Sequence, residues 1–207
     1  MLSRTSLSLA VKTVGVTGST GYIGSFVVAE LLSRGYKVNA PVRNSGKDPR
    51  KAAHLLSMPG ASGNLTVFDG GDLAVLGSFD AAFKDADAVI HTAAEVVLGE
   101  SDSIIAASVE GTSNVLSSVD KCGTVTRFVQ TSSIAAINRY DLPSTHVFTE
   151  ADWNTWSTAE NGDSYGVAKT EAERLVHGHF EDDEVSRRGE RCPEEALESE
   201  TLSRVRV

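Results

Sequence analysis

Residues 17–24 read TGSTGYIG and directly follow KTVGV (12–16), a short apolar run that is typical of a buried strand. Its three glycines, Gly18, Gly21 and Gly24, have the spacing of a loop that leads from a strand into a helix and binds the phosphates of a dinucleotide. The chain has 18 glycines in 207 residues, so spaced glycines also arise by chance. The surrounding pattern therefore has to decide whether this loop is functional.

Short β-branched runs alternate with longer helical patterns from residue 12 onward. We expect strands at 14–17, 37–43, 65–70, 87–94 and 127–133, and helices at 21–35, 48–58, 75–86, 101–123 and 164–180. Such alternation implies right-handed crossovers and a parallel sheet that is covered on both faces. The predicted fold class is therefore α/β, a Rossmann-type doubly wound parallel sheet with three αβα layers and strand order 3-2-1-4-5. The glycine loop then lies between the first strand and the first helix, where phosphate binding requires it.

The composition fits one globular domain, with 41% hydrophobic and 23% charged residues. A net charge of −9 argues against a nucleic-acid partner, and no run of about 20 apolar residues predicts a membrane span. Cys122 and Cys192 lack metal-ligand spacing, so we expect no metal site and a reducing, cytoplasmic setting. We interpret residues 1–11, which contain Arg4 and no acid, as a lead-in to the first strand rather than an organelle-targeting segment.

Each glycine of the loop has a separate expected role. Gly18 permits the tight turn, Gly21 lets the backbone approach the pyrophosphate, and Gly24 lets the helix pack close to the sheet. The helix N-terminus attracts the phosphates through its free N–H groups. Tyr22 and Ile23 supply the side chains of the loop toward the cofactor, although for Ile23 a place in the core is favoured.

The end of the second strand indicates which dinucleotide binds. The strand ends PVRN, with Arg43 where an acid usually holds the ribose of NAD. Arginine can pair with a 2′-phosphate, and Lys47 and Arg50 follow at the same corner, so NADP(H) is favoured over NAD(H). The alternative is that Arg43 is an ordinary exposed residue. Asp72 and Leu73 are placed to meet the adenine, although Asp72 can instead be a helix N-cap.

A second group of residues indicates carbonyl chemistry. Tyr165 and Lys169 lie four apart on one predicted helix face, where the lysine can stabilise the phenolate and bind the nicotinamide ribose. The TSS segment (131–133) ends the fifth strand, and its Ser133, or alternatively Ser132, can hydrogen-bond a substrate carbonyl oxygen. Tyr165 would give that oxygen a proton while hydride reduces the carbon. The alternative for either serine is a strand-end cap.

Seven segments, in chain order, make residues 12–179 resemble the extended short-chain dehydrogenases/reductases. They are TGSTGYIG, PVRN, GGDLAVLGSFDAAFKDADAVIHTAA, VEGTSNVL, RFVQTSSIAAI, FTEADWNTW and SYGVAKTEAE. Within that superfamily, which includes the NAD-dependent epimerases and dehydratases, the chain is similar to the dihydroflavonol reductase, cinnamoyl-CoA reductase and aldehyde/ketone reductase group. FTEADWNTW (148–156) favours this group over the sugar epimerases and dehydratases.

The resemblance implies a catalytic trio and a set of cofactor contacts. The trio is Ser133, Tyr165 and Lys169. The residues that would line the cofactor are Gly18, Gly21, Gly24, Arg43, Asp72, Leu73 and Ala93. Many relatives have Asn where this chain has Ser108, so a proton-relay role there is not carried over. His91 corresponds to a strand residue beside the cofactor, and we favour a structural role for it over that of a base.

After residue 180 the resemblance ends. Where the family continues with a sixth strand and a substrate lobe, residues 181–207 are rich in acids and arginines and poor in large apolar residues. Such a segment is often disordered, although a short exposed helix can begin at Pro193. We therefore divide the chain into a lead-in (1–11), a NAD(P)-binding Rossmann domain (12–180) and a divergent charged tail. An altered or truncated C-terminus is favoured over an evolved regulatory tail.

Several expectations follow from a largely missing substrate lobe. One sheet edge would be unpaired, which invites self-association. An open cleft would admit water, so NADP(H) binding would be weak and turnover poor. The favoured function is NADPH-dependent reduction of a small-molecule carbonyl to an alcohol. The alternatives are a sugar-nucleotide epimerase or dehydratase, which Arg43 disfavours, and a non-enzymatic NADP(H)-binding protein, which the intact trio disfavours.

Overall fold

The computed structural model of the protein describes residues 12–95 and 103–190, and the side chains as far as residue 180. The expected lead-in (1–11) lies outside the described residues, as does the part of the expected tail after residue 190. We expected the last helix and the domain to end at residue 180. The last described helix instead continues to Glu190.

The described residues form one five-stranded sheet whose strands are all parallel. Its strands are β1 (Thr13–Thr17), β2 (Lys37–Val42), β3 (Leu65–Asp69), β4 (Ala88–His91) and β5 (Arg127–Gln130). Their order is β3-β2-β1-β4-β5, which confirms the predicted order. β1 is central, and its Val14 pairs with Val38 on one side and Ala88 on the other. Among the described residues β5 pairs only with β4.

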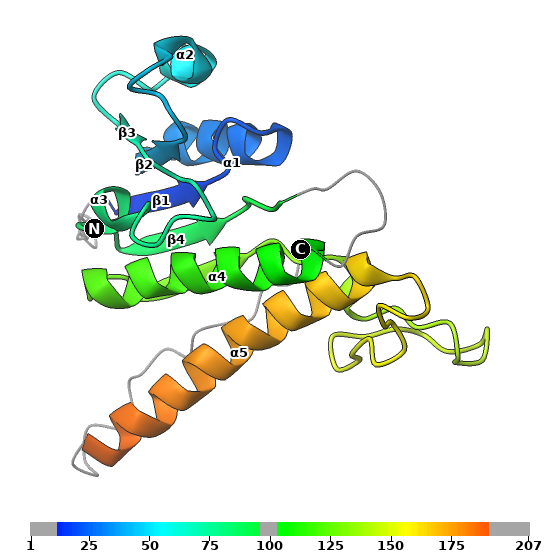
Figure 1. Cartoon of the computed structure of the whole chain (residues 1–207). Coiled ribbons are helices and arrows are strands. Elements are labelled where there is room, and N and C mark those ends of the chain that lie inside the picture. The colour runs from blue at the N-terminus through cyan, green and yellow to red at the C-terminus, as the bar shows by residue number, and fades with distance from the viewer. Residues whose placement is uncertain (1–11, 96–102, 191–207) are drawn as a thin grey trace, which may run out of the picture.

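Helices cover both faces of the sheet, as Figure 1 shows. The helical elements are α1 (Tyr22–Ser33), η1 (Pro49–Ala52), α2 (Ala53–Leu56), α3 (Asp80–Phe83), α4 (Ser103–Cys122), η2 (Ile134–Ala136) and α5 (Ser164–Glu190). In the figure α1 and α2 lie on one side of the strands, and α4 and α5 cross each other on the opposite side. The layers are those of the predicted doubly wound fold.

Two apolar cores, one on each side of the sheet, hold the layers together. The core beneath α1 and α2 includes the fully buried Val16, Val28, Val38 and Leu55. The core beneath α3, α4 and α5 includes Phe79, Phe83, Val89, Val115 and Phe128. Because side chains alternate along a strand, β4 supplies Val89 to the second core and Ile90 to the first.

Several predicted elements are shorter than their sequence patterns. The helix expected at 48–58 is split into η1 and α2, with Asp48 capping η1 through the amide of Arg50. The helix expected at 75–86 is reduced to α3, because Gly77 has a left-handed backbone (φ 77°) that ends any helix there. The strands expected at 87–94 and 127–133 end at His91 and Gln130.

The glycine loop requires glycine for two different physical reasons. Gly18 has a positive φ of 65°, which other residues adopt at a cost. Gly24 is needed for space, because a Cβ atom there would lie 2.2 Å from the carbonyl oxygen of Gly18. The first turn of α1 therefore packs directly on the backbone of the preceding turn, as expected for a helix held close to the sheet.

We predict that Gly24→Ala lowers the free energy of unfolding by about 1–3 kcal/mol or more, because the new methyl group has to displace the backbone of Gly18. The matched control is Gly178→Ala in α5, where nothing lies within 4 Å of the added Cβ. Alanine there stabilises a helix by about 0.5–1 kcal/mol. Urea unfolding followed by circular dichroism measures both; an unchanged midpoint for Gly24→Ala would contradict the packing argument.

Candidate functional site

The turn between β1 and α1 presents a helix N-terminus that fits an anion. Gly21 is the N-cap residue of α1, with extended backbone and no side chain to occupy the free N–H groups, and the first turn carries no acid. The Gly21 amide donates to the Gly18 carbonyl at 2.9 Å, which closes the turn. α1 is 12 residues long, so its dipole also favours negative charge at this end.

A buried hydroxyl in the same turn supports a phosphate ligand. Ser19 is 1% exposed, and its Oγ has no hydrogen-bond partner among the described residues. A buried donor of this kind is costly unless something accepts its proton. The residues of the turn therefore fit the pyrophosphate of a dinucleotide, since a phosphate oxygen is the acceptor that this hydroxyl and the helix N-terminus both suit.

Thr17, at the end of β1, joins the glycine loop to the end of β4. Its Oγ1 lies 2.7 Å from Nδ1 of His91 and accepts from the Ala93 amide at 3.1 Å. The Thr92 hydroxyl donates to the Thr17 carbonyl at 2.6 Å. Ala93 also lies against Gly18, whose added Cβ would be 2.8 Å from the Ala93 nitrogen. Ala93 is therefore in contact with the loop, beside the site to which the resemblance assigns it.

His91 is enclosed in the sheet and kept neutral. It is 3% exposed, and burial, together with the nearby charge of Lys169, lowers the pKa of His91 to about 4. Its hydrogen bond to Thr17 and its ring contact with Phe128 support the structural role that we favoured over a base.

The buried neutral imidazole makes stability depend on pH in a definite direction. Because the pKa of His91 falls from about 6.5 in the unfolded chain to about 4 in the folded protein, the unfolded state binds a proton first as the pH drops. The contribution of neutral His91 to the free energy of unfolding is about 3 kcal/mol. It is complete above pH 6.5 and is lost progressively as the pH falls toward 4.

We predict that His91→Asn loses this part of the pH dependence. Urea unfolding at pH 7 and pH 5 should show a smaller drop in stability for the variant than for the wild type. The comparison of the two proteins cancels the carboxyl groups that also titrate at low pH. An equal drop in both would show that His91 does not contribute.

The proposed catalytic residues come from two elements beyond the carboxyl ends of the strands. Tyr165 is in the first turn of α5 and is 45% exposed, and the Lys169 Nζ lies 5.6 Å from the centre of its ring. Ser133 is the N-cap residue of η2, and its Oγ accepts from the Ala135 amide at 3.1 Å. Ser133 thus caps the short helix η2 rather than the end of β5, which is at Gln130. Its hydroxyl proton stays available for another acceptor.

A hollow lies at the ends of β4 and β5, where the structure brings several expected residues together. Residues that line it include His91, Ala93, Ser108, Gln130, Ser132 and Lys169. Ser133 and Tyr165 are not among its lining residues. The sequence pattern does not single out Gln130, whose buried Oε1 has no partner among the described residues. Its place as the last residue of β5, directly before the TSS segment, was the available signal.

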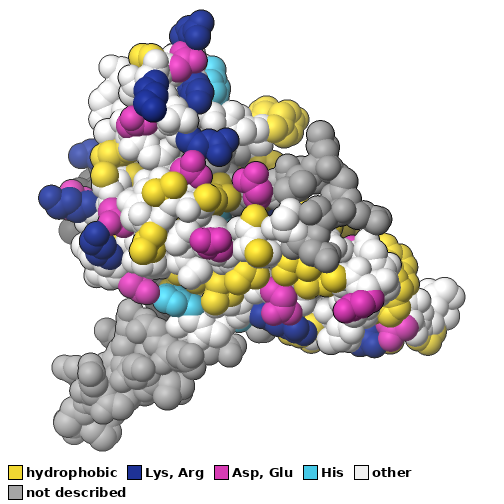
Figure 2. All heavy atoms as spheres, viewed as in Figure 1, with side chains coloured by type: hydrophobic (Ala, Val, Ile, Leu, Met, Phe, Trp, Pro, Cys, Tyr) yellow, Lys and Arg dark blue, Asp and Glu magenta, His cyan; other side chains and the backbone are white. Residues whose placement is uncertain are grey.

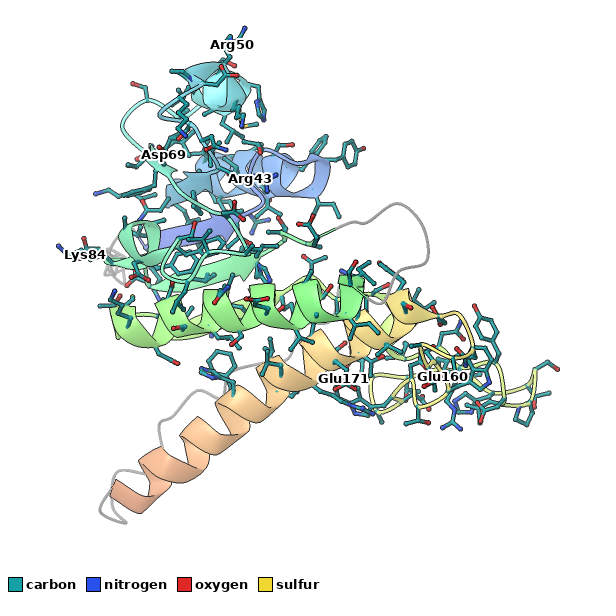
Figure 3. All side chains as sticks on the ribbon, viewed as in Figure 1. Arg43, Arg50, Asp69, Lys84, Glu160 and Glu171 are labelled. Atoms are coloured by element: carbon teal, nitrogen blue, oxygen red, sulfur yellow. The ribbon has the colours of Figure 1, made fainter. Side chains whose placement is uncertain are left out.

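At the end of β2 the expected adenine-side residues are only partly assembled. Arg43 Nη1 lies 3.9 Å from Asp72 Oδ2, and Lys51, which the sequence pattern does not single out, donates to the Arg43 carbonyl at 3.1 Å. Arg50 instead pairs with Asp48, and Figure 3 shows it on the outer side of α2, away from Arg43. Figure 2 shows Lys and Arg side chains, with acids among them, over the end that holds α2.

Asp72 and Leu73, in the loop that follows β3, have clear local roles. Asp72 accepts from the Ala74 amide at 3.1 Å, so it caps a turn, whereas the next helix begins only at Asp80; the helix N-cap that we considered is wrong. The Leu73 carbonyl accepts from the Asn114 side chain at 2.8 Å, and its side chain packs on Gly111. Leu73 also lines the hollow described above.

The favoured core position of Ile23 is wrong. Ile23 is 54% exposed and Tyr22 is 83% exposed. Both line an apolar groove that runs beside α1 and is also lined by Phe26 of the helix and Ile90 of β4. Figure 2 shows hydrophobic side chains projecting at this end of α1. The buried positions of α1 are Gly24, Val28 and Leu32 instead, because close packing at Gly24 turns that side of the helix toward the sheet.

The described residues contain neither a metal centre nor a membrane-spanning helix. Among the residues whose side chains the structure describes, 12–95 and 103–180, no group of three or more His, Cys, Asp or Glu is arranged to hold a metal ion. In the same ranges, none of the helices combines the length and apolar character needed to cross a membrane.

Comparison with known proteins identifies the family. Residues 14–192 match the model of the NAD dependent epimerase/dehydratase family, and the chain belongs to that family. It is 39% identical over 173 residues to a dihydroflavonol 4-reductase from Callistephus chinensis, covering 79% of this chain and 46% of the relative. It is 34% identical over 170 residues to vestitone reductase from Medicago sativa, covering 79% and 52%. The chain thus spans about half the length of these curated relatives.

Solved structures show the same architecture. Gre2 from Candida albicans in complex with NADPH has a TM-score of 0.71 and 29% identity, covering 82% of this chain and 53% of that one. Vestitone reductase from alfalfa has a TM-score of 0.67 and 31% identity, with coverage of 82% and 53%. These neighbours confirm the Rossmann-type fold.

Proposed function

We propose that the chain is the cofactor-binding part of an NADPH-dependent reductase that converts a small-molecule carbonyl to an alcohol. The observation that carries the proposal is the placement of Lys169 at the hollow beyond β4 and β5, beside the Thr17–Ala93 contact that closes the glycine loop. Relatives named dihydroflavonol 4-reductase, vestitone reductase and cinnamoyl-CoA reductase support the reaction class.

In this proposal separate residues donate the proton, hydrogen-bond the carbonyl oxygen and bind the cofactor. Tyr165 gives a proton to the carbonyl oxygen, and the Lys169 charge 5.6 Å from its ring centre makes the phenolate easier to form. Ser133 donates a hydrogen bond to the same oxygen and keeps its proton. When bound, the reduced nicotinamide supplies the hydride that completes the reduction. The loop at Gly18, Gly21 and Gly24 holds the dinucleotide in place.

The preference for NADPH is part of the proposal. Arg43 lies at the end of β2, with its guanidinium largely exposed and its backbone carbonyl held by Lys51. A 2′-phosphate at this corner would meet a forked donor and a second cation. Asp72 is the one feature that counts against it, since its carboxylate lies 3.9 Å from Arg43 and would have to turn aside.

The exposure of Tyr165 supports slow turnover by this chain. At 45% exposure its hydroxyl-bearing ring is open to water, whereas proton and hydride transfer proceed best where water is excluded. We therefore propose that residues 12–180 on their own reduce carbonyls slowly.

We predict that Tyr165→Phe lowers aldehyde-dependent oxidation of NADPH by about 10²-fold or more while NADPH affinity stays unchanged, because only the proton donor is removed. A panel of aliphatic and aromatic aldehydes, followed at the NADPH absorbance, measures turnover, and calorimetry measures binding. Tyr36→Phe, outside the site, is the matched control. Equal turnover of Tyr165→Phe and the wild type would show that Tyr165 is not the proton donor.

We predict that Arg43→Glu weakens NADPH binding about tenfold or more and leaves NADH binding nearly unchanged, since only NADPH carries the 2′-phosphate. Calorimetric titration with each nucleotide tests this. Arg50→Glu is the control, because Arg50 points away from the corner. Equal losses for both nucleotides would mean that Arg43 does not select between them.

A further inference from the structure

The residues that we propose for proton transfer are held on two separate elements. Ser133 lies in the turn formed by residues 131–136, here called the serine turn, whereas Tyr165 and Lys169 lie on α5. The connection between them, residues 137–163, contains no regular helix or strand. Their relative positions therefore depend on side-chain contacts, and an error of about 1 Å in such a site can cost about 10²-fold in rate.

Glu173 makes a direct tie between α5 and the serine turn. Glu173 is 4% exposed, and its Oε2 accepts from the Ser132 hydroxyl at 2.5 Å. Oε1 lies 3.5 Å from Nε2 of His177, one turn further along α5. A buried carboxylate is costly without hydrogen bonds, so these contacts constrain where the helix can lie. Glu173 follows Lys169 by four residues and hence lies on the same helix face.

Asn154 makes a second tie from the connecting segment to the serine turn. It is 4% exposed, its Nδ2 donates to the Ala135 carbonyl at 2.8 Å, and its backbone amide donates to the Ala136 carbonyl at 2.8 Å. Its Oδ1 accepts from the amides of Trp156 and Ser157 at 3.1 and 3.0 Å. One side chain thus fixes both the serine turn and the connecting segment.

A relay of hydrogen bonds continues from Asn154 to the start of α5. Asn154 Nδ2 donates to the Ser157 hydroxyl at 2.6 Å, and that hydroxyl donates to Oδ2 of Asp163 at 2.5 Å. The Asp163 Oδ1 accepts from the Gly166 amide at 3.0 Å, which caps the first turn of α5. The relay ends beside Tyr165.

Gly166 shows that the relay occupies space next to Tyr165. An added Cβ at Gly166 would lie 2.5 Å from both the Asp163 carboxylate and the Ser157 hydroxyl. Gly166 is not among the glycines of positive φ, so its backbone conformation does not call for glycine. Glycine is therefore needed at position 166, beside the proposed proton donor, because the side chains of Ser157 and Asp163 fill the space that a Cβ atom would take.

We propose that Asn154 and Glu173 are positioning residues that lock the start of α5 onto the serine turn, one at each end of the Tyr165–Lys169 face. They touch neither the cofactor nor the reacting atoms in this role; they act through Ser132, Ser157 and Asp163. The catalytic part of this inference rests on the proposed reductase function, whereas the structural part concerns only how α5 is held.

The structural part is tested by backbone hydrogen exchange in residues 166–170 of the full chain. We expect Glu173→Leu and Asn154→Ala to speed exchange there about tenfold or more, with the centre of α4 unchanged. Glu171→Gln is the matched control, because Glu171 pairs at the surface with Arg174. Both tryptophans of the chain, Trp153 and Trp156, lie beside Asn154, so a shift in their fluorescence is expected in Asn154→Ala. Glu173→Leu is expected to shift it as well, because His177, the partner of Glu173, packs on the Trp153 ring.

The catalytic part is tested in the same variants by steady-state kinetics with NADPH and an aldehyde. We expect kcat to fall tenfold to hundredfold while KM for NADPH stays unchanged. Glu173→Gln should retain most of kcat, because its amide oxygen can still accept from Ser132. Asn154→Asp keeps the acceptor for the amides of Trp156 and Ser157 but loses both donors, so it tests the tie if Asn154→Ala does not fold.

The outcomes separate the two proposals. Unchanged exchange and unchanged kcat in Glu173→Leu and in the asparagine variant would overturn the positioning role. Faster exchange in a chain whose wild type reduces none of the aldehydes would support the tie and count against the reductase. Loss of NADPH affinity together with kcat would place these residues in cofactor binding and overturn the inference as stated.

Discussion

The site depends on the hydrogen bonds that the Thr17 hydroxyl makes. This hydroxyl lies at the end of the central strand and bonds to His91 and Ala93, so that the end of β4 and the glycine loop are fixed to each other. The loop is also packed from the other side, since the first turn of α1 rests directly on the carbonyl of Gly18. Phosphate-binding groups are therefore placed by the backbone of two adjacent strands, and their geometry is as rigid as the sheet itself.

The other half of the site is positioned by polar contacts of a different kind. α5 packs mainly against α4 through apolar side chains, and such packing tolerates small shifts along the helix axis. The buried hydrogen bonds of Asn154 and Glu173 remove that tolerance, because each has a narrow range of length and angle. The apolar core thus sets where α5 lies, and the polar ties select its register.

Much of the fold could be predicted because its signals are local. Apolar runs located all five strands and their order, and the glycine spacing located the turn at Gly18. The failures have long-range causes. The exposure of Ile23 depends on which side of α1 meets the sheet, and the roles of Asn154 and Glu173 depend on carbonyls and hydroxyls 18 to 41 residues away. No periodicity in the sequence reports contacts of that sort.

The sequence separation around Thr17 also bears on how the chain acquires its structure during synthesis. Its two partners lie 74 and 76 residues further along the chain, so β1 and the glycine loop are complete long before the groups that satisfy them have left the ribosome. Until β4 has been synthesised, the central strand β1 can pair on only one side. Long-range parallel pairing of this kind is slow and leaves apolar surface open to chaperones. Until β4 has been synthesised, the nascent chain therefore lacks the residues that hold the glycine loop in place.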